Sequence, residues 1–430
     1  MLDKFFSKKF KGDGIIWMVF FLLCIISIIE VYSASSVLSY KSGNYWSPVL
    51  KHSGLLMVGF VCMIVVLNIK CKYFKIVTPF LLLAAFVTLL WVLVAGQSTN
   101  GAQRWISLVG IQFQPSEIAK GAMILAVAQI LSAMQTDHGA DRRAFKYIMI
   151  VSAFIIPLIM VENLSTAALL CLVILMMMFI GRVPMSQIGR LMGAGMLLIV
   201  FLFSMVMLVG KEDEKKSDDK LAITEQTTEA EIEAPGVLDK IFHRAGTWKS
   251  RIIKHMDNKE ISPYEFDLDK DAQVAHANIA IASSNIVGKG PGNSVERDFL
   301  SQAFSDFIYA IIIEEMGIIG AFVVCLLYII LLFRTASIAN RCVNAFPALL
   351  IMGLALLLVT QALFNMLVAV GLVPVTGQPL PLISKGGTST IINCIYIGAI
   401  LSVSYSAKKK DEEPAEHTKG RQLKPAFSEA

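Results

Sequence analysis

The sequence predicts an all-α polytopic membrane protein with about ten transmembrane helices and one large extracytoplasmic loop. Hydrophobic residues fill 55% of the 430 positions and charged residues only 17%, whereas about a quarter of the residues in a soluble domain are charged. So little charge cannot cover this much apolar surface, which excludes a soluble multidomain protein. The formal net charge of +5 is small, so it does not indicate nucleic-acid binding.

Long apolar runs mark the predicted spans, because a run of about 18 or more residues with few charges can cross a bilayer as a helix. Lys8, Lys9 and Lys11 precede the first run, as in a signal peptide. No small-residue cleavage site follows that run, and the run is too long for a signal peptide, so we predict a retained helix. The runs cover approximately residues 14–34, 48–68, 74–95, 115–134, 145–162, 164–181, 187–209, 307–333, 346–370 and 388–406.

Basic residues set the predicted orientation, because short loops rich in Lys and Arg stay in the cytoplasm. They fall in alternate connections, namely Lys4, Lys8, Lys9, Lys11, Lys70, Lys72, Lys75, Arg142, Arg143, Arg182, Arg190, Arg334, Arg341, Lys408, Lys409 and Lys410. Both termini, residues 1–13 and 407–430, are therefore predicted to be cytoplasmic. Spans one to seven occupy 14–209 and spans eight to ten occupy 307–406. The outward loops are then 35–47, 96–114, 163, 210–306 and 371–387.

The outward loop 210–306 is the one large segment outside the predicted spans. Residues 211–235 are acidic and low in complexity, which predicts disorder. In residues 236–256 apolar and basic side chains alternate, a pattern typical of an amphipathic helix at the membrane–water interface. An ordinary packed loop helix is the alternative for this segment.

The cysteines and histidines give little support to a metal site or a disulfide framework. The seven cysteines lie in or beside apolar runs and form no C-x-x-C pair, and the six histidines show no H-x-x-x-H spacing. No cofactor is therefore predicted. A bound divalent cation stays open as an alternative, although the sequence shows no ligand set for one.

Polar groups precede the fourth span. Arg104 offers a cation for a phosphate, and Trp105 offers an aromatic plate for a sugar or lipid headgroup, with a membrane-belt aromatic as the alternative. Gln114 opens the run Gln-Pro-Ser-Glu-Ile-Ala-Lys, in which Glu117 and Lys120 share one helix face and can pair. That pair is either the wall of a polar cavity or a structural ion pair between helices, and both interpretations stay open.

Two further outward segments are rich in glycine. Residues 288–294, Gly-Lys-Gly-Pro-Gly-Asn-Ser, can bring backbone N–H groups to a phosphate, although they lack the P-loop pattern and a tight turn is the alternative. Residues 371–389 contain three prolines and four glycines, which forbid a simple helix. Such backbone is tolerated at membrane depth only beside protein or a water-filled cavity, and Lys385 there is a candidate for binding an anion. A plain extracellular loop is the alternative.

Asp306 lies where the large loop meets the eighth span, with Glu314 and Glu315 further inside. A lone acid at this position is either the N-cap of the helix or a general base in a partly desolvated cleft.

Three strings together resemble one family: NGAQRWI…QPSEIAK, GKGPGNSVERDFL…SDFIYAIIIEEMG and GLVPVTGQPLPLISKGGTS. They are similar to the SEDS family (shape, elongation, division and sporulation proteins), and to its cell-division branch more than its elongation branch. The resemblance runs from the first span to the tenth, without residues 210–235 and the tail. The chain departs from the family at Phe304 and Ser305, where the family has His-Thr, at Asn163, where it has Asp, and at Lys385, where it has Tyr.

The resemblance implies a peptidoglycan glycosyltransferase of the bacterial inner membrane that polymerises lipid II during septal cell-wall synthesis. Lipid II is a disaccharide-pentapeptide on undecaprenyl pyrophosphate. The implied partners are a class B penicillin-binding transpeptidase and other division proteins. Asp306 matches the essential aspartate of the family and is the predicted catalytic base. The predicted substrate-binding residues are Arg104, Trp105, Gln114, Glu117, Lys120, Asn293, Ser294, Lys385, Gly386 and Gly387.

Two other functions stay open. A flippase for lipid-linked oligosaccharides would also need buried charges, but it would line a path through the whole membrane, whereas the groups here cluster at the outward face. A non-enzymatic scaffold of the division complex would leave Asp306 and Lys385 replaceable.

Overall fold

A computed structural model describes most of the apolar part of the chain. The described residues are 11–34, 46–95, 97–99, 102–108, 111–137, 139–209, 268–300 and 304–421. The acidic stretch 211–235 and the predicted interfacial helix 236–256 lie outside them. The chain forms two compact units, one of residues 1–187 and 267–430 and one of residues 188–266.

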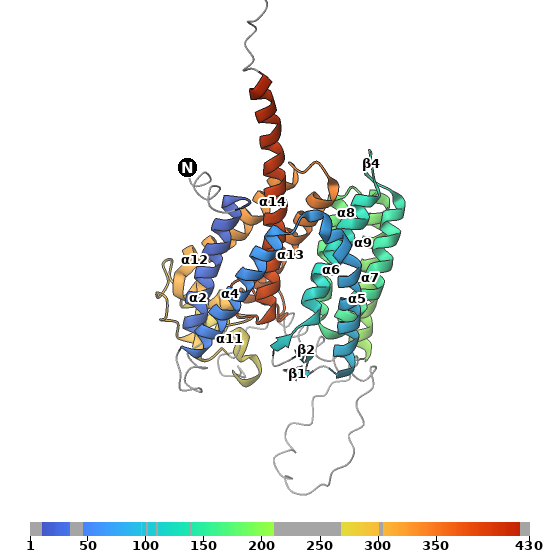
Figure 1. The fold of residues 1–430 in the computed structure, drawn as a ribbon. Coiled ribbons are helices and arrows are strands. Elements are labelled where there is room, and N and C mark those ends of the chain that lie inside the picture. The colour runs from blue at the N-terminus through green and yellow to red at the C-terminus, as the bar shows by residue number, and fades with distance from the viewer. Residues whose placement is uncertain are drawn as a thin grey trace, which may run out of the picture. The chain divides into compact units, whose positions relative to one another are not determined.

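The described chain is helical almost throughout, which confirms the predicted all-α membrane fold (Figure 1). Each predicted span overlaps a helix. Within the described residues, eight helices are long and apolar enough to cross a membrane, and α8 is a shorter apolar helix. The helices are α2 (Gly14–Ala34), α4 (Ser47–Asn68), α5 (Cys71–Ala95), α6 (Pro115–Ala133), α7 (Arg142–Glu162), α8 (Leu164–Ile180), α9 (Met185–Val209), α11 (Leu268–Ala282), α12 (Ile308–Ala339), α13 (Ala345–Ala369) and α14 (Thr388–Arg421).

Local sequence explains where several helices begin. Pro115 opens α6, where its missing N–H costs nothing because the first turn of a helix has no acceptor for it. The Asp141 side chain accepts a hydrogen bond from the Arg143 N–H at 2.8 Å and caps α7. Asn163 separates α7 from α8, and its side chain accepts a hydrogen bond from the Ser165 N–H at 3.1 Å. Asn163 is therefore both the C-cap of α7 and the N-cap of α8.

A small antiparallel sheet replaces the predicted loop 96–114. Its strands are β1 (Gln97–Thr99), β2 (Ala102–Leu108) and β3 (Ile111–Phe113), in that spatial order. β2 contacts α5, α6 and α7, so the sheet fixes the entry to α6. Two further short strands, β4 (Gln135–Thr136) and β5 (Gly139–Ala140), form a hairpin after α6.

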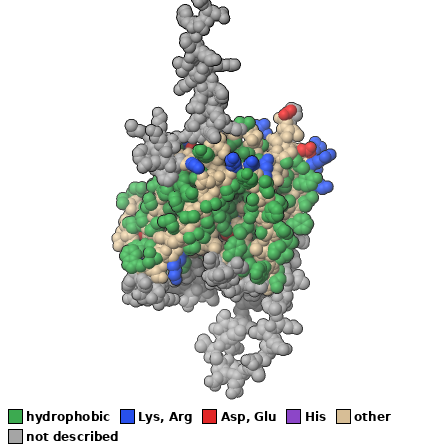
Figure 2. Space-filling model, in the orientation of Figure 1, with side chains coloured by type: hydrophobic (Ala, Val, Ile, Leu, Met, Phe, Trp, Pro, Cys, Tyr) green, Lys and Arg blue, Asp and Glu red, His purple; other side chains and the backbone are tan. Residues whose placement is uncertain are grey.

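On the face shown in Figure 2, hydrophobic side chains cover most of the described surface, and most of the Lys and Arg side chains lie near one end. Phe80, Leu83 and Val94 on α5 are 69%, 62% and 83% exposed, which suits contact with lipid tails rather than with water. The protein is therefore a multi-pass membrane protein.

Helices α4 and α14 pack against each other, and a glycine permits their close approach. A Cβ atom on Gly398 would lie 2.7 Å from the Met63 carbonyl oxygen, which belongs to the backbone and cannot move aside. We expect Gly398→Ala to lower the free energy of unfolding by about 1–3 kcal/mol, because the two helices must separate. Thermal unfolding in detergent measures this loss.

Gly54→Ala on α4 is the matched control for that change. Gly54 is exposed, and a Cβ atom there would meet nothing within 4 Å. Ala is the better helix former, so this variant should be as stable as the wild type or slightly more stable. Equal melting temperatures for the two variants would show that the α4–α14 contact does not need a glycine.

Candidate functional site

Asp306 lies two residues before the first residue of α12, and it does not cap that helix. The N-cap residue is Phe307, with no side-chain cap, so the N-cap interpretation of Asp306 is wrong. Asp306 is half-buried, and its Oδ1 accepts a hydrogen bond from the Ser305 hydroxyl at 3.0 Å. The turn 304–307 thus places the carboxylate just before the start of α12.

The proline- and glycine-rich loop 371–387 holds the turn that carries Asp306. The Lys385 N–H donates to the Phe304 carbonyl oxygen at 2.9 Å, and the Ser384 hydroxyl donates to the Ser305 carbonyl oxygen at 2.5 Å. The Lys385 ammonium also lies 5.0 Å from the centre of the Phe304 ring, within range of a cation–π contact. The structure therefore brings Asp306 and Lys385, which are predicted in separate segments, into one place.

Asn365 on α13 joins the same turn to the loop from the other side. Its Nδ2 donates to the Asp306 carbonyl oxygen at 2.8 Å and to the Gln378 carbonyl oxygen at 2.7 Å. Gln378 in turn donates to the Thr166 hydroxyl on α8 at 2.6 Å. Asn365 was not predicted as a site residue, although an amide in the middle of an apolar run was the visible signal.

Glu117 and Lys120 form the predicted ion pair on α6. Their side chains are 2.8 Å apart and only 3% and 1% exposed, which confirms the pairing. The Lys120 ammonium also donates to Gln361 Oε1 on α13 at 2.8 Å, and Gln361 Nε2 donates to the Pro379 carbonyl oxygen at 3.0 Å. The pair is therefore connected through Gln361 to the loop that holds the Asp306 turn.

The glycine-rich segment 288–294 has partners inside the protein. The Ser294 hydroxyl donates to Glu314 Oε2 at 2.5 Å, and the Ser294 N–H donates to Glu315 Oε1 at 3.3 Å. Asn293 is exposed, and its Nδ2 donates to the Lys289 carbonyl oxygen at 2.9 Å. The predicted tight turn is present, whereas contact of Asn293 and Ser294 with substrate stays a prediction.

The remaining predicted residues lie in three places. Trp105 is half-buried in β2, opposite Gln97, and the Arg104 side chain lies outside what the structure describes. Gln114 donates to the Ser116 hydroxyl at 3.0 Å at the start of α6. Gly386 and Gly387 form the turn into α14, where the Gly386 carbonyl oxygen accepts from the Ser389 hydroxyl at 2.8 Å.

A buried contact between α2 and α4 also reaches the loop. Ser27 Oγ lies 2.7 Å from His52 Nε2 and donates to the Ile383 carbonyl oxygen at 2.7 Å. Neither residue was predicted, and again a polar residue inside an apolar run was the available signal. Loop 371–387 is thus held by side chains from α2, α8 and α13, which makes it a fixed part of the site.

Comparison with known proteins gives a consistent result for the whole chain. The family model FTSW_RODA_SPOVE, described as "Cell cycle protein", matches residues 13–216 and 235–409. Among curated relatives, a "Probable peptidoglycan glycosyltransferase FtsW" of Geobacter sp. (strain M18) is 29% identical over 403 residues, covering 92% of this chain and 98% of the relative. The protein of the same description from Halomonas elongata is 29% identical over 413 residues and covers 94% and 93%.

Solved structures share the fold. A chain of the structure reported as "Structural coordination of polymerization and crosslinking by a peptidoglycan synthase complex" superposes with a TM-score of 0.66 at 21% identity, covering 91% of this chain and 98% of that chain. The rod shape determining protein RodA of Thermus thermophilus superposes with a TM-score of 0.60 at 21% identity and covers 92% and 98%.

Proposed function

The chain belongs to the FtsW, RodA and SpoVE family of cell cycle proteins. We propose that it is a peptidoglycan glycosyltransferase that polymerises lipid II. The observation that supports the proposal is that the predicted charged residues are connected to one loop, residues 371–387. Asp306 and Lys385 meet there, and the buried Glu117–Lys120 pair reaches the same loop through Gln361. A carboxylate beside cations is what transfer of a sugar from a pyrophosphate requires.

Asp306 is the base in the proposed reaction. Its carboxylate takes the proton from the acceptor sugar hydroxyl, whose oxygen then attacks the anomeric carbon of the donor sugar. The new glycosidic bond forms as the bond from the anomeric carbon to the pyrophosphate breaks, and undecaprenyl pyrophosphate leaves with the bonding electrons. One carboxylate suffices for this single inverting displacement, because the acceptor supplies the nucleophile.

Arg104, Lys120 and Lys385 are the proposed contacts of the leaving pyrophosphate. Lys385 is half-buried beside the Asp306 turn, so it can meet charge that develops near Asp306. The Lys120 ammonium contacts Glu117 and Gln361, and its side chain is almost fully buried. Trp105 is the proposed platform for a sugar ring.

The proposed orientation places both termini in the cytoplasm and the site at the outer face of the inner membrane, following the basic residues of the alternate loops. The proposed partner is a class B penicillin-binding transpeptidase, which would crosslink the strands that this chain makes. The relative reported in a peptidoglycan synthase complex supports an assembly of this kind.

The pKa of Lys385 gives this site a pH dependence. Burial, and then the charge of Lys51, lower the pKa of the Lys385 ammonium below its ordinary value of 10.5. Lys385 therefore loses its charge at a lower pH than an ordinary lysine, and the polymerisation rate should fall with it on the alkaline side. Lys385→Arg keeps the charge, so we expect the alkaline decline of kcat/KM to move to higher pH. If kcat/KM of Lys385→Arg declines at the same pH as that of the wild type, Lys385 does not take part in the reaction.

A reconstituted assay separates polymerisation from transport. The purified full chain, alone and with a class B transpeptidase, is placed in vesicles that contain lipid II. We expect glycan strands to form from lipid II on the side that carries the site. Movement of lipid II between leaflets without strands would favour a flippase, and neither activity would favour a scaffold.

A further inference from the structure

α12 is broken at the far end of the short helical segment that follows Asp306, and the glycine-rich loop fills the break. Gly317 interrupts the helix with φ +68° and ψ −172°. A broken helix leaves carbonyl groups without helical donors. Here the Lys289 N–H donates to the Glu314 carbonyl oxygen at 3.0 Å, and the Gly290 N–H donates to the Glu315 carbonyl oxygen at 2.8 Å. The loop thus supplies the donors that the helix lacks.

Two glycines let the backbones touch at this point. A Cβ atom on Gly288 would lie 2.3 Å from both the Glu315 carbonyl oxygen and the Gly317 nitrogen, and one on Gly317 would lie 2.3 Å from the Ile286 carbonyl oxygen. Both glycines have positive φ, at +83° and +68°. No other residue fits at either position without moving the loop away from the break.

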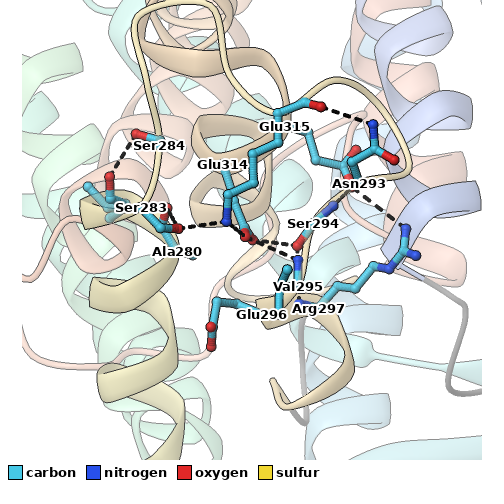
Figure 3. Close-up of polar contacts among 12 residues, drawn as sticks. Ala280, Ser283, Ser284, Asn293, Ser294, Val295, Glu296, Arg297, Glu314 and Glu315 are labelled. Atoms are coloured by element: carbon cyan, nitrogen blue, oxygen red, sulfur yellow. Dashed lines mark hydrogen bonds and ion pairs between the residues drawn. The ribbon is translucent and has the colours of Figure 1, made fainter.

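The Glu314 side chain is fully buried and is held by the same loop (Figure 3). Its carboxylate accepts hydrogen bonds from the Lys289 ammonium at 2.6 Å, the Ser294 hydroxyl at 2.5 Å and the Val295 N–H at 3.1 Å. A buried carboxylate is costly unless it is paired, and this one has both a cation and neutral donors. Glu314 therefore has little freedom to move relative to the loop.

The Glu315 side chain is also fully buried and connects the loop to α2. It accepts hydrogen bonds from the Gly292 N–H at 3.0 Å and from the Ser33 hydroxyl on α2. Arg297 donates to the same hydroxyl at 2.9 Å, and its Nη1 lies 3.9 Å from Glu315 Oε1. Helix α2, the loop and the break in α12 are thus fastened together.

This arrangement fixes the short helical segment 308–316 at both ends. Its start is held by Asn365 and loop 371–387, which bond to the backbone of the Asp306 turn. Its end is held at Glu314 and Glu315. An α-helix rises about 1.5 Å per residue along its axis, so a shift at the Gly317 end of this short segment also shifts its start. The position of Asp306 therefore depends on both attachments.

We propose that residues 288–297, bound to Glu314, Glu315 and Gly317, form a glycine clamp that positions Asp306 for proton transfer. The inference rests on the proposed function and deepens it. Ser294 and Lys289 are then positioning residues, which act through the α12 segment and do not contact the sugar. When a catalytic base is displaced, kcat falls much more than substrate binding weakens.

The first test compares two glycines of the clamp. Gly288→Ala places a Cβ atom against the break, whereas Gly292→Ala, at a similar φ of +86°, meets nothing within 4 Å. With the full chain, lipid II and a class B transpeptidase, we expect kcat of Gly288→Ala to be at least about tenfold below that of Gly292→Ala, with similar KM. Equal kcat values would overturn the inference.

A second pair of variants covers the case that Gly288→Ala does not fold. Ser294→Ala removes the hydroxyl that donates to the Glu314 carboxylate, and Ser294→Thr keeps a hydroxyl at that position. We expect Ser294→Ala to lower kcat severalfold at unchanged KM and Ser294→Thr to restore most of it. A raised KM with unchanged kcat would mean that Ser294 contacts substrate, and the clamp would be wrong.

The wild-type chain, assayed in parallel, separates the two claims. If the wild type makes no strands, the proposed function fails. If the wild type makes strands and both comparisons show no difference in kcat, only the clamp fails.

Discussion

Asp306→Asn should abolish strand synthesis: we expect turnover of lipid II to fall by about 10²–10⁴-fold, the usual contribution of a general base. Asn keeps the size of the side chain and its hydrogen bond from Ser305, but it cannot take a proton from a sugar hydroxyl. The carbonyl oxygens of the turn accept hydrogen bonds from the Asn365 and Ser384 side chains and from the Lys385 N–H, so the fold should be unaffected. The measurement is the initial rate of polymerisation by the purified chain with its transpeptidase.

Asp137→Asn is the matched control, because Asp137 is an exposed acid in the hairpin between β4 and β5. It should polymerise at the wild-type rate. Asp306→Glu keeps a carboxylate but moves it by one methylene, so it should retain part of the activity. Normal polymerisation by Asp306→Asn, at wild-type melting temperature, would remove Asp306 from the chemistry.

Breaking the Glu117–Lys120 pair should give the largest loss of stability. Lys120→Met leaves Glu117 as a buried charge without its cation, which costs about 3–5 kcal/mol. The Glu117 Oε2 atom already lacks a hydrogen-bond partner among the described residues, so little else can compensate the charge. Thermal or denaturant unfolding in detergent measures the loss.

The double variant Glu117→Gln with Lys120→Met decides between the two interpretations of this pair. Removing both charges should restore most of the stability, because no uncompensated charge remains. We expect the double variant to fold and yet polymerise poorly, because the proposed pyrophosphate contact is gone. A double variant that recovers both stability and activity would make the pair a structural link between α6 and α13 only.

The spans were predictable because hydrophobic length is a property of single segments. Each apolar run became a helix, and Pro115 began α6 as its ring favours. The sheet β1–β3 was not predicted, because β1 and β3 have only three residues each and the seven residues of β2 do not strictly alternate between polar and apolar. The extension of α14 to Arg421, past the apolar run, reflects a charged segment rich in good helix formers.

The site was predictable only in part. Charge and position were enough to predict Asp306, Lys385 and the Glu117–Lys120 pair. The hydrogen bonds that connect these residues to one loop come from Asn365 and Gln361, which look like ordinary residues of an apolar helix. For the glycine-rich segment the sequence offered two interpretations, a tight turn and a loop whose N–H groups contact a phosphate. The segment's actual acceptors are the carboxylates and the carbonyl oxygens of Glu314 and Glu315. The carbonyl oxygens are available because α12 breaks at Gly317, and no local pattern encodes that contact.

The amount of undecaprenyl pyrophosphate released per lipid II consumed tests the central claim most directly. Each glycosidic bond that forms must release one lipid pyrophosphate. We predict one released lipid pyrophosphate for each disaccharide added by the wild type, and almost none from Asp306→Asn. Equal release by both proteins, or loss of lipid II from one leaflet with no release, would contradict the account.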